Sequence, residues 1–269
     1  MTRDRKRVKK VRGKQRDIPQ VTNSSNVRAA DTCLRVLQQI AFAEGPQGVT
    51  QIAARMGIAK SAVHKHLRTL IDHGMILQDP STSLYRLGPK VWLMGQKAPH
   101  GQALAEIALP LMQAVRDELG LAVVLSVPTP RSAFVLATLR SNQPIDIGVQ
   151  PGSELQLHSS AQGRVFLAFG PAELWEQLED PLKAVTPKTT TSIDKLTRDV
   201  DRVRELGFSV VPEESLLGIN ALAAPIFSAD RTLVGSIGLI GSIQHLPSQP
   251  TPHQLAVLMN LTGAISSRI

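Results

Sequence analysis

The sequence predicts an α+β protein with two domains: a small N-terminal domain of three helices and a hairpin, then a larger domain built on an antiparallel sheet. Apolar residues recur at helical spacing through residues 26–73, and two strand-like runs follow within residues 75–87. Beyond residue 104, predicted strands are grouped before and after helices, which is typical of an antiparallel sheet covered by helices. The length of 269 residues accommodates two such domains.

Residues 1–25 are predicted to be a disordered basic tail. Residues 1–17 contain nine Lys/Arg and two Asp, a net charge of +7, whereas residues 18–90 carry +4 and residues 91–269 carry −3. Like charges repel each other, and few apolar residues are available to form a core. This asymmetry favours a tail that contacts a polyanion such as DNA. The alternative is a tail that only keeps the protein in solution.

The first helix is predicted within residues 26–41, ahead of the helix-breaking segment Glu44–Gly48. Cys33 lies in its apolar stretch and is interpreted as a core residue. The helical spacing predicts a buried face that consists of Ala30, Leu34, Leu37 and Ala41.

Two further helices are predicted before the hairpin. Thr50 is placed to cap the second helix, which Gly57 ends. The third helix is predicted from Lys60 to His73, and Gly74 stops it. The predicted buried residues are Ile52, Ala53 and Met56 in the second helix and Val63, Leu67 and Leu70 in the third.

The tight turn at Gly57–Ala59 between two short helices has the spacing of a helix-turn-helix. The outer face of the third helix carries small or hydrogen-bonding side chains, which suit contact with base edges in a major groove. A polar helix face is usually only solvated, but this one directly follows the turn of the motif. The residues of this helix that are predicted to contact DNA are Lys60, Ser61, Ala62, His64, Lys65 and Arg68.

A hairpin is predicted from Met75–Leu77 and Leu84–Leu87, with a turn at Asp79–Ser83. Two strands after a recognition helix form a wing. Arg86 on the second strand is placed to reach a phosphate or the minor groove. Residues 26–90 are therefore predicted to be a winged helix-turn-helix domain.

Residues 91–103 are predicted to be a linker, because Gly95, Pro99 and Gly101 interrupt them. Residues 104–269 form the second predicted domain. Its helices are expected at Leu104–Leu119, from Ser160 past Phe169, at Ile193–Leu206 and at Thr251–Ile269. Its strands are expected at Ala122–Val127, Ala133–Leu139, Ile145–Val149, Phe208–Val211, Leu222–Phe227 and Leu233–Ile240.

Several classes of protein are excluded by composition and motifs. A single cysteine excludes an internal disulfide and a multi-cysteine metal site. No apolar run approaches the roughly 18 residues that span a membrane, and the charged start does not resemble a secretory signal, so we expect a cytoplasmic protein. Phosphate-loop, dinucleotide and hydrolase motifs are missing, and the adjacent His158, Ser159 and Ser160 do not make a catalytic triad. We therefore predict that the protein is not an enzyme and needs no metal or cofactor.

Four segments, in this order, resemble the IclR family of bacterial transcriptional regulators, and the likeness covers nearly the whole chain after the tail. Gly57–Leu67 resembles that family's turn and recognition helix, and Tyr85–Gly88 resembles the end of its wing. Leu157–Arg164 resembles its effector-site loop. Glu213–Glu214, with Gly218–Ile219 and Ala223–Pro225, resembles another of its signatures.

The resemblance implies that residues 104–269 form a GAF-like α/β domain that binds a small effector and joins the chain into oligomers. The effector would often be a carboxylate or an aromatic acid. A homodimer or homotetramer on double-stranded, palindromic operator DNA is also implied. The first helix and the segment near Trp92 would help to pair the DNA-binding domains.

The start of the helix after Ser160 can hold a carboxylate without a cationic side chain, because its first N–H groups are unpaired and the helix dipole is positive there. The candidate effector-binding residues at this turn are Ser160, Ala161, Gln162 and Gly163. The alternative is that Ser160 only caps the helix.

The chain departs from the family pattern at two places. The wing tip has Ser83 and Leu84 where the family often has a basic residue and Gly, so this tip is expected to contact DNA less. Val211 replaces an acidic residue and Ala221 replaces a Cys, which favours an apolar pocket over one for a small polar effector. Val211, Ala221 and Leu222 are predicted to wall that pocket.

The sequence thus predicts a DNA-binding transcriptional regulator, more often a repressor, whose operator binding responds to an organic or aromatic acid. The alternative is a ligand-independent DNA-binding protein whose second domain only oligomerises. A metabolite that raises thermal stability would distinguish the two.

Overall fold

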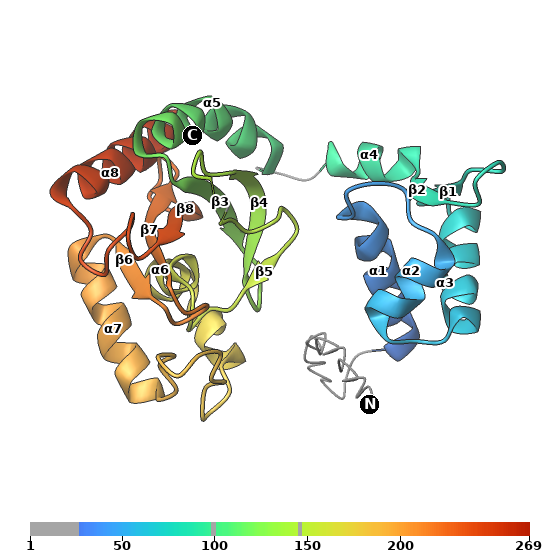
Figure 1. The fold of residues 1–269 in the computed structure, drawn as a ribbon, viewed down its shortest axis with the longest axis horizontal. Coiled ribbons are helices and arrows are strands. Elements are labelled where there is room, and N and C mark those ends of the chain that lie inside the picture. The colour runs from blue at the N-terminus through green and yellow to red at the C-terminus, as the bar shows by residue number, and fades with distance from the viewer. Residues whose placement is uncertain (1–26, 98–100, 145–146) are drawn as a thin grey trace, which may run out of the picture. The chain divides into compact units, whose positions relative to one another are not determined.

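The computed structural model describes residues 27–97, 101–144 and 147–269, which fall into two compact units, Met1–Pro89 and Lys90–Ile269 (Figure 1). The predicted basic tail, residues 1–25, lies outside the described residues. Its contact with DNA phosphates therefore stays a prediction.

The first unit is a winged helix-turn-helix, as predicted. It contains α1 (Arg28–Ala41), α2 (Val49–Met56), α3 (Lys60–Asp72) and the antiparallel hairpin of β1 (Ile76–Gln78) and β2 (Tyr85–Leu87). Gly57 has a φ of 66°, a left-handed conformation that glycine adopts without steric cost, and it ends α2. The predicted buried residues of α2 and α3 all lie in the core: Ile52, Ala53, Met56, Val63, Leu67 and Leu70.

The predicted buried face of α1 is wrong except for Leu37, which packs against the core. Leu34 is 59% exposed, and Ala30 is exposed as well. The helix instead packs on α3 and β2 through a second apolar stripe at the same i, i+3, i+4, i+7 spacing. That stripe is Cys33, Val36, Leu37 and Ile40. Spacing alone does not decide between two such stripes, because both satisfy the helical period.

The predicted cap of α2 also differs. The helix begins one residue before Thr50, and its N-cap is Gly48. The side chain of Gln51 accepts a hydrogen bond of 2.9 Å from the Gly48 backbone N–H, which satisfies a group that has no helical partner.

The hairpin is attached to the helices on both sides. Gln47 and Tyr85 exchange two backbone hydrogen bonds of 3.0 and 2.8 Å, which tie β2 to the segment between α1 and α2. On the other side, Gly88 lies against Gly74, where a Cβ atom on Gly88 would stand 2.4 Å from the Gly74 carbonyl oxygen. The hairpin therefore has a defined place beside α3.

The predicted linker is largely helical. α4 spans Pro89–Gly95, and α5 (Gly101–Leu119) begins at the last of the predicted helix breakers. Gly95 and Gly101 lie at helix ends rather than in an extended connection. Residues 98–100 between the two helices lie outside the described residues.

The second unit contains a six-stranded sheet in which every pairing is antiparallel, as predicted. The strand order is β5-β4-β3-β8-β7-β6. The strand predicted at residues 145–149 is not formed over 147–149, and the short β5 pairs with β4 instead. The strands are β3 (Ala122–Pro128), β4 (Ala133–Leu139), β5 (Glu154–Leu155), β6 (Ser209–Pro212), β7 (Ile219–Phe227) and β8 (Leu233–Ser242).

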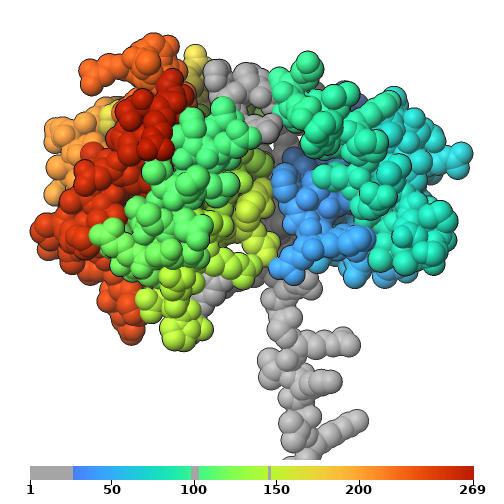
Figure 2. Space-filling view, turned by 90° about the horizontal axis from the view of Figure 1, so that it is seen from above, coloured from blue at the N-terminus to red at the C-terminus, as the bar shows by residue number. Residues whose placement is uncertain are grey.

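Helices cover both faces of this sheet (Figure 1). α5 and α8 (Pro252–Ser266) lie side by side over one face, as Figures 1 and 2 show in green and red. α6 (Ala161–Phe169) lies on the other face, and α7 (Ile193–Leu206) packs beside it; a short 3-10 helix, Ala172–Gln177, follows α6. The two faces form separate apolar cores, one with Leu125 and Leu239, the other with Phe166 and Leu196.

Among the described residues, no helix is long and apolar enough to cross a membrane. In the same part of the chain, no group of His, Cys, Asp and Glu has the geometry of a metal site.

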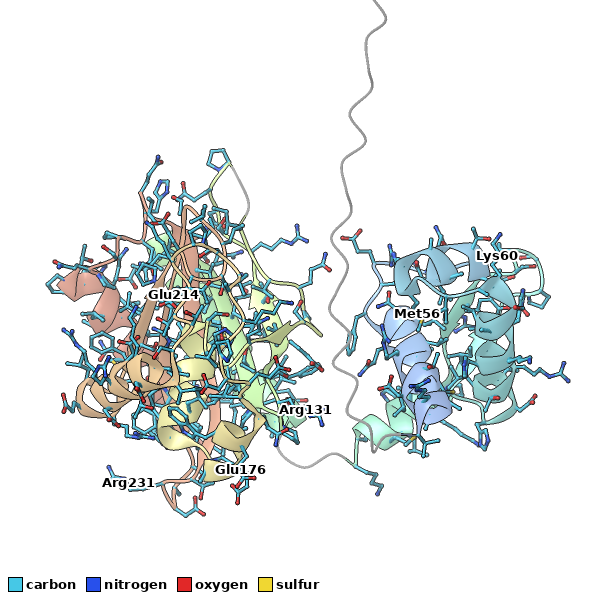
Figure 3. The ribbon with its side chains drawn as sticks, turned by 90° about the horizontal axis from the view of Figure 1, so that it is seen from below. Met56, Lys60, Arg131, Glu176, Glu214 and Arg231 are labelled. Atoms are coloured by element: carbon cyan, nitrogen blue, oxygen red, sulfur yellow. The ribbon has the colours of Figure 1, made fainter. Side chains whose placement is uncertain are left out.

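A buried ion pair joins α6 to the β6–β7 connection. The Arg164 Nη2 atom donates to both carboxylate oxygens of Glu214, at 2.8 and 2.7 Å, and the two side chains are 5% and 8% exposed. Arg164 Nε donates to the His158 carbonyl at 2.9 Å, and the backbone N–H of Thr190 donates to Glu214 at 2.8 Å. Figure 3 shows Glu214 among other side chains of this unit, while the labelled Arg231 and Glu176 lie at its periphery. A buried charge pair of this kind is stable only because neighbouring donors and acceptors complete it.

Removal of one partner of this pair tests its contribution. Glu214→Gln leaves the buried Arg164 charge with only the more distant Asp199 carboxylate, at 3.6 Å, so we expect the free energy of unfolding of the second unit to fall by about 3–5 kcal/mol. Urea denaturation followed by circular dichroism measures it. Asp201→Asn is the matched control, because it breaks the exposed Arg204–Asp201 pair in the same unit and should cost less than about 1 kcal/mol. Equal losses in the two variants would show that the buried pair does not stabilise the fold.

Candidate DNA-binding surface and ligand site

The outer face of α3 forms a polar stripe. Ser61, His64, Lys65 and Arg68 are exposed and recur at i, i+3, i+4 and i+7, opposite the buried face of the helix. Lys60 is the first residue of the helix and lies at the edge of the unit in Figure 3, whereas Ala62 is half-buried. The fold therefore presents most of the predicted DNA-contacting residues of α3 on one face.

A hollow of about 580 Å³ lies between this stripe and the hairpin. Sequence reasoning missed one of its polar residues, Gln78 of β1, whose side chain donates to the Ser83 carbonyl at 3.2 Å. Only the place of the hairpin beside α3 brings Gln78 to this surface. The hollow is lined by His64, Lys65, Leu67, Arg68, Ile71, Gln78 and Tyr85.

The arginines of this surface lie near carboxylates only in exposed positions. Arg68 pairs with Asp72 at 3.4 Å, but the two side chains are 81% and 60% exposed, so water screens the attraction and the pair is easily broken. Arg86 is exposed on β2, close to Asp79 of the hairpin turn. Hydrogen bonds from the Ser81 side chain and from the Ser81 and Thr82 backbone lower the pKa of Asp79.

The start of α6 is the second candidate site. Ser160 is its N-cap: the hydroxyl accepts from the Gly163 N–H at 3.0 Å and donates to the Gln156 carbonyl at 2.6 Å. Both hydrogen-bonding roles of Ser160 are thus used within the fold. The N–H groups of Ala161 and Gln162 stand at the helix start, where α-helical geometry supplies no partner.

The side chain of Gln162 also has a structural role. It is buried, and its amide donates to the Val124 carbonyl at 3.1 Å and to the Ser126 hydroxyl at 2.8 Å, which ties α6 to β3. Gly163 is required at its place, because a Cβ atom there would stand 2.5 Å from the Gln156 and Leu157 carbonyl oxygens. His158 is buried, and this burial lowers its pKa, so the ring is neutral at neutral pH. At this turn, backbone groups rather than side chains remain for a ligand.

Two of the three predicted apolar walls lie together, and the third does not. Val211 of β6 is paired with Ala221 of β7, and both contribute to the core on the α6 face of the sheet. Leu222 belongs to the opposite core, beneath α5 and α8. Successive side chains of a strand point to opposite faces, so Leu222 cannot wall the same space as Ala221. This prediction is corrected.

The structure adds apolar neighbours that the sequence did not indicate. Ala221 lies where the α6-face core meets a smaller cluster on the same face of the sheet, formed by residues of β3, β4 and β8 and by part of the segment between β4 and β5. Pairing across the sheet brings these residues together, so no local spacing reveals them. The cluster contains Ala122, Val124, Val135 and Ile240, with Ile147, Val149, Leu155 and Ile219 packed against it.

Family models match both units. The IclR helix-turn-helix domain matches residues 29–80, and the bacterial transcriptional regulator IclR C-terminal domain matches residues 96–267. The glycerol operon regulatory protein of Streptomyces coelicolor is 29% identical over 248 residues, which cover 90% of this chain and 96% of that protein. The transcriptional repressor IclR of Escherichia coli is 25% identical and covers 87% of each chain.

Solved structures share the fold over the same range. An IclR transcriptional regulator from Alicyclobacillus acidocaldarius has a TM-score of 0.71 at 24% identity, covering 90% of this chain and 98% of that one. An IclR homolog from Microbacterium hydrocarbonoxydans complexed with 4-hydroxybenzoate has a TM-score of 0.73 at 21% identity, covering 89% and 98%. With a helix-turn-helix and a C-terminal domain that both match, the chain belongs to the IclR family of bacterial transcriptional regulators.

Proposed function

We propose that this regulator represses transcription by placing α3 in the major groove of operator DNA and the hairpin on the flanking backbone. The polar stripe of α3 and the adjoining hollow carry this proposal, because they form one continuous surface with hydrogen-bonding groups for base edges and cations for phosphates. Several relatives are named repressors, which supports repression. The protein acts in the cytoplasm, without enzymatic activity and without a cofactor.

The operator-bound form is a homodimer or a homotetramer. One winged helix reads only a few base pairs, so specificity requires two copies on related half-sites. Large apolar side chains support this assembly: Leu34 of α1 is 59% exposed, and Trp92, Leu93 and Met94 of α4 are 67%, 54% and 60% exposed. Exposed apolar groups of this size are typical of surfaces that a partner covers.

The effector is a small organic acid with an apolar body. Its carboxylate is bound by the backbone N–H groups of Ala161 and Gln162, and its body lies against Val211 and Ala221. The apolar cluster next to Ala221 supports this assignment, as does the relative complexed with 4-hydroxybenzoate. The second candidate is a ligand-independent DNA-binding protein. The side chains of Ser160 and Gln162 favour it, because they hydrogen-bond to the backbone of the fold itself.

Alanine variants of the α3 stripe test the DNA-binding surface. We expect Lys65→Ala and Arg68→Ala each to weaken binding to a duplex selected by the protein from random DNA by about 1–3 kcal/mol if the residue reads a base. Gel-shift titrations on this duplex and on a scrambled one measure affinity and specificity. Lys97→Ala is the control, since it removes the same charge outside α3 and the hairpin. Wild-type affinity in both variants would contradict this role of α3.

A carboxylate placed in the apolar site tests the effector assignment. We expect 4-hydroxybenzoate to raise the thermal midpoint of the wild-type protein, because a ligand of the native state stabilises it. Ala221→Asp should abolish this rise through charge repulsion while operator affinity without ligand stays near wild type. Ala229→Asp, in the exposed turn between β7 and β8, is the control. A rise that persists in Ala221→Asp would place the site elsewhere, and no rise in any protein would exclude this acid as a ligand.

A charged residue in α4 tests the assembly. Trp92→Asp should shift the sedimentation equilibrium of the full chain toward smaller species and weaken binding to a palindromic duplex, because two half-sites would no longer be occupied together. Gln96→Asp, at the exposed end of the same segment, is the control. Unchanged sedimentation and DNA affinity would remove α4 from the interface.

A further inference from the structure

A groove of about 530 Å³ runs along β6, the edge strand of the large sheet. One wall is a face of α7 that carries Lys195, Asp199, Arg202 and Leu206, and the other wall comprises Ser248–Pro250 and Leu255 of α8. The volume lies within the range of about 300–1,000 Å³ that is usual for small-molecule sites. Its lining does not include Ala161, Val211 or Ala221, so this groove is separate from the proposed effector site.

The charges in the groove are not balanced. Arg164 is paired with Glu214 at 2.7 Å and lies 3.6 Å from Asp199, so these three groups together carry a net charge of −1. Lys195 and Arg202 are exposed on α7 and make no hydrogen bond or ion pair through their side chains within the described part of the chain. With Lys195 and Arg202, the charged side chains of the lining carry a net charge of +1, and the two cations without a partner favour an anion.

The rest of the lining is mostly apolar. The apolar lining consists of Val203 and Leu206 of α7, Phe208 and Val210 around the edge strand, and Leu255 of α8. Ser209 also lines it, and its buried hydroxyl has no hydrogen-bond partner among the described residues. A buried hydroxyl without a partner is uncommon in a native fold and marks a place where a ligand can complete the hydrogen bonding.

An added peptide strand does not suit this edge. β6 has four residues, and Pro212 among them has no N–H to donate to a neighbouring strand. Short edge strands that contain proline are a common protection against strand addition. The groove therefore favours a compact ligand over an extended peptide.

We propose that this groove is a second ligand site, which binds a small organic anion with an apolar or aromatic body. Its carboxylate lies between Lys195 and Arg202, and its body covers Val203, Phe208 and Val210. Neither the start of α6 nor the DNA-binding surface takes part.

Naphthoate is a suitable probe, and equilibrium dialysis of the full chain measures its binding. We expect saturable binding, and we expect Lys195→Glu with Arg202→Glu to weaken it about tenfold or more, because each substitution replaces an attraction with a repulsion. Both residues are exposed, so the variant should keep the wild-type thermal midpoint. Arg198→Glu with Arg268→Glu is the matched control, with the same change in net charge outside the groove.

The Ala221→Asp variant separates this site from the proposed effector site. The proposal is supported if the Lys195/Arg202 variant binds naphthoate more weakly, while Ala221→Asp and the control bind it as the wild type does. This holds whatever the outcome for 4-hydroxybenzoate. Affinity that falls in Ala221→Asp places naphthoate at the start of α6 and overturns the proposal. The proposal is also overturned if no saturable binding occurs, if the control loses as much affinity, or if uncharged naphthamide binds as tightly as naphthoate.

Discussion

The buried ion pair between Arg164 and Glu214 is the constraint on which the second unit depends. Four segments meet at it: α6 through Arg164, the β6–β7 connection through Glu214, the segment before α7 through Thr190, and α7 through Asp199. Two charges that leave water require several partners, so each segment is held in one position by the same network. The place of the α6 start, the proposed carboxylate site, follows from it.

Glycines determine the first unit in a comparable way. The hairpin lies beside α3 because Gly88 approaches the backbone of Gly74 and because Gln47 and Tyr85 bind each other through their backbones. A side chain at residue 88 would force the hairpin away from α3. The polar stripe of α3 and Gln78 then form one surface, although no single element contains it.

The two sites of the second unit differ in how they would recognise an anion. At the start of α6, backbone N–H groups and the helix dipole supply the positive potential, and the surroundings are apolar. In the groove along β6, two exposed cations supply it. A backbone site is less affected by salt than a site of exposed cations, because exposed charges are screened. A regulator with both sites could respond to two acids or to one acid at two concentrations.

Most of the elements, the helix-turn-helix with its wing and the antiparallel sheet follow from the sequence alone, because turn glycines and apolar periods are local signals. The family was indicated separately, by the resemblance of four motif segments. Only the tertiary structure decided which of two apolar stripes of α1 is buried, since Ala30–Leu34 and Cys33–Val36 fit the helical period equally well. It also decided that Leu222 faces away from Ala221, because a shift of one residue along a strand exchanges the two faces of a sheet. The buried ion pair between residues 164 and 214, and the groove between α7 and α8, join segments far apart in sequence, where no local pattern relates the partners.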